Sequence, residues 1–81
     1  AGHPNVGASL VNLALFYRDQ GNNAAAEPLY KRALEIYEKA LGSGNPRVAD
    51  TLEGVAELLR KMGRNAEAQR METRARSIRA R

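Results

Sequence analysis

The sequence predicts an all-α fold of two helical hairpins stacked in tandem, and three observations support this prediction. The chain repeats itself with a period of 42 residues, and about a third of the paired positions are identical. Within each repeat, apolar residues recur at helical spacing. Proline and glycine separate four helical segments. A period of about 20 to 50 residues is typical of solenoids, in which each unit buries its apolar face against its neighbours.

We treat residues 1–81 as a single domain, with a first repeat at 3–42 and a second at 45–81. The predicted helices cover residues of about 4–20, 24–41, 46–62 and 66–80. Each repeat has a proline at the start of its first helix, where the fixed φ of proline is favourable. Gly21 and Gly63 follow the first helices. A glycine there can adopt positive φ and end the helix without steric cost.

The four predicted helices differ in how much of their surface is apolar. The first is apolar nearly all round, as expected of a helix with neighbours on several sides. The last has one narrow apolar stripe flanked by arginines, and a polar outer face is what the terminal unit of an array needs for solubility. Two units are fewer than the roughly three that arrays need. We therefore expect the C-terminal two repeats of a longer array, or a unit that completes its core by self-association.

Small and apolar residues of the first repeat have the spacing of a known helical repeat. They are Leu10, Leu13, Ala14, Tyr17, Gly21, Ala26, Tyr30 and Ala33. On these residues the chain resembles the tetratricopeptide repeat. With its 42-residue period it is similar to the longer subclass found in kinesin light chains and many bacterial repeat proteins. Glu72 departs from the pattern in the second repeat. The resemblance implies a right-handed superhelix of hairpins whose first helices line a concave groove, and a protein or peptide partner held there.

Helical spacing marks the side of each first helix that would face this groove. These residues, which we call the groove face, are Ala8, Val11, Asn12, Leu15 and Asp19 in the first repeat and Asp50, Glu53, Glu57 and Lys61 in the second. An exposed asparagine can donate and accept hydrogen bonds at once, which suits the backbone of an extended peptide. The alternative is that Asn12 lies on a solvated face without a ligand. Gly54 replaces the matching asparagine, and the acidic residues favour a ligand with basic side chains.

Two other surfaces give alternative hypotheses. Val6, Leu13 and Phe16 lie on a flank that a preceding repeat would cover, so they could pair with a second copy of the chain. The last helix has an excess of arginine, which could attract nucleic acid or another anionic partner. No aromatic residue accompanies these arginines, so base stacking is unsupported. We regard nucleic acid as an unlikely partner and the arginines as a solvated cap.

The composition argues against several classes of function. The chain has no cysteine, which excludes a disulfide framework and a thiolate metal site. Its one histidine, His3, has no ligand or nucleophile partner nearby in the sequence and is interpreted as a helix-entry residue. No apolar run is long enough to span a membrane, and there is no phosphate-binding glycine loop. We expect no enzyme activity, no cofactor and no metal. We expect a cytoplasmic protein, because the lack of cysteine is compatible with a reducing compartment.

Overall fold

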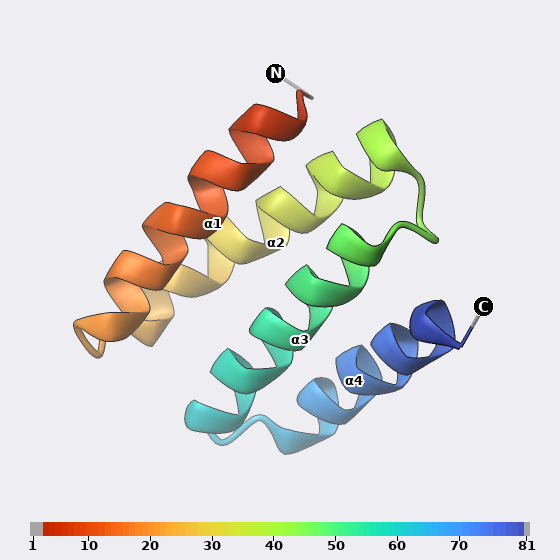
Figure 1. Cartoon of the computed structure of the whole chain (residues 1–81). Helices are drawn as coiled ribbons and strands as arrows, with labels where there is room; N and C mark the ends of the chain where they lie inside the picture. The colour runs from red at the N-terminus through yellow and green to blue at the C-terminus, as the bar shows by residue number, and fades with distance from the viewer. Residues whose placement is uncertain (1–2, 81) are drawn as a thin grey trace.

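The computed structural model of the protein describes residues 3–80. Within this range there are four α-helices and no strand: α1 (Pro4–Asp19), α2 (Asn23–Leu41), α3 (Pro46–Lys61) and α4 (Asn65–Arg79). Consecutive helices run antiparallel and lie side by side in chain order (Figure 1). α1 and α2 form one hairpin, α3 and α4 form the other, and α2 packs on α3 to join them. The all-α fold of two hairpins is therefore confirmed.

The starts of the helices follow the local sequence. The side chains of His3, Asn22 and Asn45 each accept a hydrogen bond from a backbone amide in the first turn of α1, α2 and α3. Such caps satisfy amide groups that have no partner inside the helix. α2 begins at Asn23, after the capping side chain of Asn22, and α4 begins at Asn65, after Arg64, whose side chain makes no capping hydrogen bond. Both starts lie one residue before the predicted position.

The ends of α1 and α3 depend on a glycine that follows each helix. Gly21 and Gly63 have φ values of 79° and 78°, as predicted from the sequence. The residues before them, Gln20 and Met62, have ψ values of 5° and 3° and form the C-caps. The two helices therefore end one residue earlier than predicted, because the chain leaves the helical conformation before it reaches the glycine.

The core lies where each helix meets the next one along the chain. One buried cluster consists of Ala14, Ala26, Tyr30, Val55, Ala56, Leu58, Leu59 and Ala68. The other consists of Ala33, Leu34, Tyr37, Val48, Ala49, Leu52, Ala75 and Ile78. The largest side chains that are fully buried all belong to α3, which packs on both α2 and α4. Fully buried alanines let the axes of crossing helices approach closely.

Two tyrosines of α2 pack against glycines on the neighbouring helices. A Cβ atom at Gly7 of α1 would lie 3.0 Å from the nearest ring carbon of Tyr37. A Cβ atom at Gly54 of α3 would lie 2.9 Å from the nearest ring carbon of Tyr30. Both distances are too short for an unstrained carbon contact. The absence of a side chain at Gly54 therefore has a structural role, because it leaves space for the Tyr30 ring from the preceding repeat.

Candidate protein-binding surface

The α1 part of the groove face combines apolar side chains with one exposed amide. Asn12 and Asp19 are exposed, whereas Ala8, Val11 and Leu15 are half-buried. The placement of all five on the side away from α2 stays a prediction. Val11 packs in part against both buried clusters, which include residues of α3, and Leu15 packs against one of them. The apolar surface that α1 offers to a partner is thus the exposed remainder of these side chains, next to the Asn12 amide.

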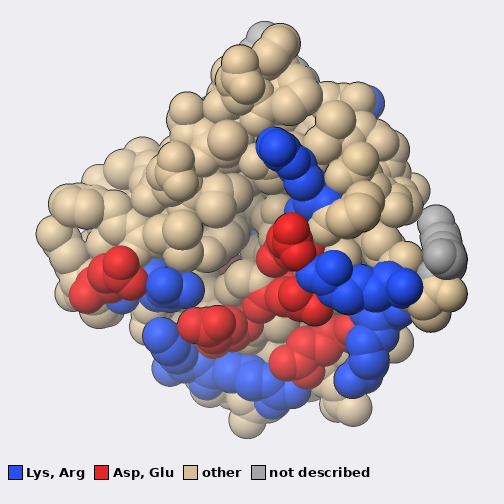
Figure 2. All heavy atoms as spheres, viewed as in Figure 1, with Lys and Arg blue, Asp and Glu red and all other residues tan. Residues whose placement is uncertain are grey.

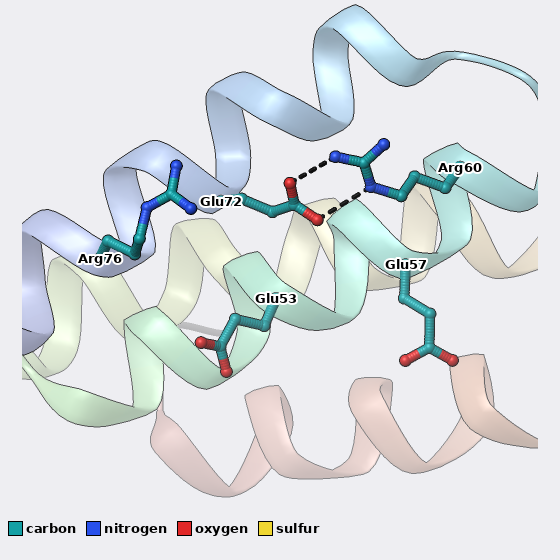
Figure 3. Close-up of a pocket in the computed structure, with 5 residues that line it drawn as sticks. All are labelled: Glu53, Glu57, Arg60, Glu72 and Arg76. Carbon is teal, nitrogen blue, oxygen red and sulfur yellow. Dashed lines mark hydrogen bonds and ion pairs between the residues drawn. The ribbon is translucent and has the colours of Figure 1, made fainter.

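The α3 part of the groove face is charged, and all four predicted residues are exposed. Glu53 and Glu57 extend from α3 on the side where α1 lies (Figure 3). The Arg79 guanidinium donates to both carboxylate oxygens of Glu53, at 3.0 and 2.9 Å, and also to Asp50. Hydrogen bonding of the Glu53 carboxylate with Arg79 lowers the pKa of Glu53 below its ordinary value. The acidic residues of α3 are therefore paired within the chain.

Arg18 connects the two halves of the groove face, and sequence reasoning did not single it out. Its guanidinium lies 3.2 Å from the Asp19 carboxylate and 3.4 Å from that of Glu57. The Lys61 amine lies 3.8 Å from the same Glu57 oxygen. Because Arg18 and Glu57 are 39 residues apart in sequence, only the stacking of the hairpins brings them together. An ion pair thus bridges α1 and α3 across the face.

A hollow of about 490 Å³ adjoins the groove face at the α4 side of α3. It is lined by Glu53, Glu57, Arg60, Glu72 and Arg76. Arg60 meets Glu72 between α3 and α4 in a two-pronged ion pair, with Nε donating to Oε2 at 2.9 Å (Figure 3). Figure 2 shows charged side chains gathered over α3 and α4, while the surface over most of α1 is uncharged. The molecule therefore offers a mostly uncharged half and a charged half to a partner.

The comparison with protein families matches the tetratricopeptide repeat over residues 5–81. The chain belongs to the tetratricopeptide-repeat family. Members of this family are in general protein-interaction and scaffolding modules. The comparison with curated proteins gave no significant match. The two stacked helical hairpins of the structure are the fold expected of this family.

One flank of α1 is an apolar surface that this tetratricopeptide-repeat chain leaves exposed. Val6, Leu13 and Phe16 are 37%, 43% and 54% exposed, and they are the exposed large hydrophobic residues of the part that the structure describes. α2 packs on another side of α1, where Gly7 and Ala14 are buried. The three residues predicted to face a neighbour are therefore exposed on one flank.

A second charged cluster ties the two tetratricopeptide repeats together away from the groove face. The Glu27 side chain on α2 lies 2.7 Å from the Lys31 amine and 2.7 Å from the Arg64 guanidinium. Arg64, the residue before α4, also bonds Glu67. Hydrogen bonding with Lys31, and then with Arg64, lowers the pKa of Glu27. Since Glu27 is only 15% exposed, this cluster should contribute more than a pair in open solvent.

We predict that Glu27→Gln lowers the free energy of unfolding at pH 7 by about 1 kcal/mol. The folded pKa of Glu27 lies below its unfolded value, so its stabilisation is present above the unfolded pKa and is lost as the pH falls through the folded value. Urea unfolding measured from pH 7 to pH 2.5 should show the difference from wild type shrinking below about pH 4.5. A difference that persists unchanged at the lowest pH would contradict the role of the Glu27 charge.

Two further classes of site are absent from the described range. Residues 3–80 contain no group of three or more histidine, cysteine or carboxylate side chains that could hold a metal ion. None of the helices in this range is long and apolar enough to cross a membrane.

Proposed function

We propose that this chain binds an extended segment of a protein or peptide partner along its groove face, without catalysis. The observation that supports this proposal is the exposed Asn12 amide, which lies beside the half-buried Val11 and Leu15. No hydrogen bond joins the Asn12 side chain to another residue in the range 3–80. Its donors and acceptor are thus available to the backbone of a ligand. The 42-residue period supports the longer, kinesin-light-chain-like subclass as part of this proposal.

The ligand should have apolar side chains over α1 and basic side chains over α3. The Glu53 and Glu57 carboxylates already pair with Arg79 and Arg18, so a basic ligand residue must share or replace one of these pairs. Exposed ion pairs contribute only about 0–1 kcal/mol, so the exchange costs little and adds little affinity. We therefore expect charge to set the orientation of the ligand, while the apolar contacts and the backbone hydrogen bonds supply its affinity.

The test uses three synthetic decapeptides in which leucine alternates with lysine, glutamate or serine. Titrations followed by NMR should show binding, with the lysine peptide preferred and shifts at Val11 and Leu15. Asn12→Ala should weaken binding about five- to tenfold, the effect of one hydrogen bond, and should leave thermal unfolding unchanged. Gln69→Ala removes an exposed amide from the outer side of α4 and serves as the control. Preference for the glutamate peptide would refute the charge orientation, and no binding by any of the three would refute the proposal.

We propose self-association through the α1 flank as a second candidate function. The spacing of Val6, Leu13 and Phe16 is seven and three residues, the pattern of a narrow coiled-coil seam. None of the three carries a charge, so two α1 helices related by a two-fold axis would meet without repulsion. The exposure of all three residues favours this over a purely monomeric module.

Phe16→Glu is predicted to remove this self-association. Sedimentation equilibrium should show a monomer–dimer equilibrium for the wild type and a monomer for Phe16→Glu at the same concentrations. Because Phe16 is 54% exposed, the substitution should leave the helix content and the thermal unfolding of the monomer nearly unchanged. A wild-type chain that stays monomeric at millimolar concentration would remove this candidate and leave peptide binding untouched.

We propose that the arginine-rich α4 presents a solvated outer face and is not a nucleic-acid site. Arg74 pairs with Glu38, and Arg79 pairs with Glu53, so part of the positive charge is already neutralised. Arg70 and Arg76 have no carboxylate partner within the described part of the chain. Two scattered guanidinium groups without an aromatic neighbour form a weak electrostatic footprint for nucleic acid.

A further inference from the structure

The tip of Tyr30 lies on α3 at the place that corresponds to Asn12 on α1. Gly54 follows Asn12 by one period of 42 residues, so the two positions are equivalent in the repeat. Gly54 has no side chain, and the ring of Tyr30 from α2 reaches into the space. A Cβ atom at Gly54 would lie 2.9 Å from Cε1, 3.0 Å from Cζ and 3.1 Å from the hydroxyl oxygen of Tyr30. The hydroxyl of Tyr30 thus lies 3.1 Å from the point where the side chain of residue 54 would begin.

Among residues 3–80, the Tyr30 hydroxyl has no hydrogen-bond partner. Tyr30 is only 3% exposed, and no hydrogen bond joins its hydroxyl to another described residue. Buried tyrosine hydroxyl groups usually find a partner. Among residues 3–80, the Oδ1 atom of Asn23 is the side-chain oxygen or nitrogen that is both fully buried and unpaired. The Tyr30 hydroxyl is also unpaired but is not among the fully buried atoms. The small exposed part of Tyr30 therefore includes its hydroxyl.

Tyr30 is neutral at physiological pH, so its hydroxyl can donate a hydrogen bond. Burial raises the pKa of Tyr30 above its ordinary value, although the nearby Arg18 opposes this shift. The charges that act on Tyr30 are Arg18, Glu57 and Asp19, which all belong to or adjoin the groove face. The geometry agrees, because the hydroxyl oxygen lies 3.1 Å from the Cβ position of Gly54, which stands between Glu53 and Glu57 of the groove face in the sequence.

We propose that Tyr30 is a second ligand-binding residue of this module, whose hydroxyl donates to a backbone carbonyl of the extended partner segment. Asn12 contacts the segment in the first repeat, and Tyr30 contacts it one repeat further on. This inference rests on the proposed function, and it explains why the second repeat needs no asparagine at position 54. The ligand is a polypeptide backbone, so the contact is independent of the side chains of the partner.

Tyr37 provides a matched control on the same helix. It is 5% exposed, and its ring packs on a glycine of a neighbouring helix, as the ring of Tyr30 does. Gly7 is buried and does not belong to the groove face, whereas Gly54 is half-buried. At Gly7 the three nearest atoms are ring carbons and do not include the hydroxyl. Tyr37→Phe therefore removes a comparable hydroxyl from outside the proposed site.

The experiment compares wild type, Tyr30→Phe, Tyr37→Phe and Asn12→Ala in titrations with the leucine–lysine decapeptide. Tyr30→Phe should weaken binding about five- to tenfold at unchanged thermal stability, and Tyr37→Phe should have no effect. A set of decapeptides, each with one backbone amide replaced by an ester, adds a readout that a structural role would not move. An ester carbonyl is a weaker acceptor, so one ester position should weaken binding to wild type but not weaken it further in Tyr30→Phe.

Three other results would contradict the Tyr30 contact. If Tyr30→Phe binds as wild type does while Asn12→Ala is weakened, the Tyr30 contact is refuted and the proposed function stands. Equal weakening by Tyr30→Phe and Tyr37→Phe would show a general effect of hydroxyl removal and would also refute it. If the leucine–lysine decapeptide does not bind to the wild type, this peptide is not a ligand of the chain. The proposed contact between Tyr30 and the peptide backbone is then refuted as well.

Discussion

Leu52→Ala should lower the free energy of unfolding by about 2–5 kcal/mol. Leu52 is fully buried on α3. It belongs to the cluster to which α2, α3 and α4 all contribute, so the substitution opens a cavity where the two hairpins meet. Small domains are stabilised by only about 5–15 kcal/mol, and often by less at this length. A single deletion of this size should therefore leave the chain close to its unfolding threshold.

Urea unfolding followed by circular dichroism measures this loss. Because the cavity is shared by both hairpins, all four helices should unfold in one transition at a lower urea concentration. Leu13→Ala is the matched control, since Leu13 is 43% exposed on α1 and should cost less than about 1 kcal/mol. Two separate transitions, or equal effects of the two substitutions, would contradict the packing of α2 on α3 as the joint of the fold.

The parts of the fold that local sequence determines could be predicted. A cap, a proline or a glycine acts on the turn in which it stands, so the four helices are found within one residue of their true ends. The remaining error has a local cause as well. Asn22 and Arg64 are the residues that precede α2 and α4, one residue further upstream than expected, and the apolar pattern alone does not distinguish such a residue from the loop before it.

The candidate site could be predicted only in part, because its electrostatics depend on pairs distant in sequence. The spacing placed Glu53 and Glu57 on an exposed face of α3, and both are exposed. It could not show that Arg79, which is 26 residues from Glu53, folds back onto that carboxylate. The bridge from Arg18 to Glu57 across 39 residues has the same origin. Helical periodicity predicts on which side of its own helix a residue lies. It does not predict which charged side chains of a neighbouring helix will lie beside that residue.

Gly54 shows how a sequence pattern can be interpreted in two ways. Compared with Asn12 in the first repeat, it suggests a lost hydrogen-bonding group. In the structure the ring of Tyr30 fills the space above it. The glycine and the tyrosine are thus one feature, and each is understood only with the other. Their coupling can be measured in a double-mutant cycle.

Gly54→Ala should destabilise the chain in the wild type and stabilise it when the Tyr30 ring is removed. Alanine is favoured over glycine within a helix by about 1 kcal/mol. Against this gain, the new Cβ would lie 2.9 to 3.1 Å from the tip of a ring that is almost fully buried. Overpacking of that kind costs about 1–3 kcal/mol. Since the ring is packed in the core cluster to which α2 and α3 both contribute, we expect the steric cost to exceed the helical gain.

In the Tyr30→Leu background the steric cost disappears and the helical gain remains. Gly54→Ala should then raise the free energy of unfolding by up to about 1 kcal/mol, even though Tyr30→Leu alone is destabilising. Urea unfolding of the four chains closes a double-mutant cycle, and its coupling energy measures the contact between ring and glycine. If Gly54→Ala has the same sign in both backgrounds, the ring can move away at little cost. The Tyr30 ring would then not be the reason for a glycine at position 54. Packing against Gly54 would also no longer fix the position of the Tyr30 hydroxyl near the groove face.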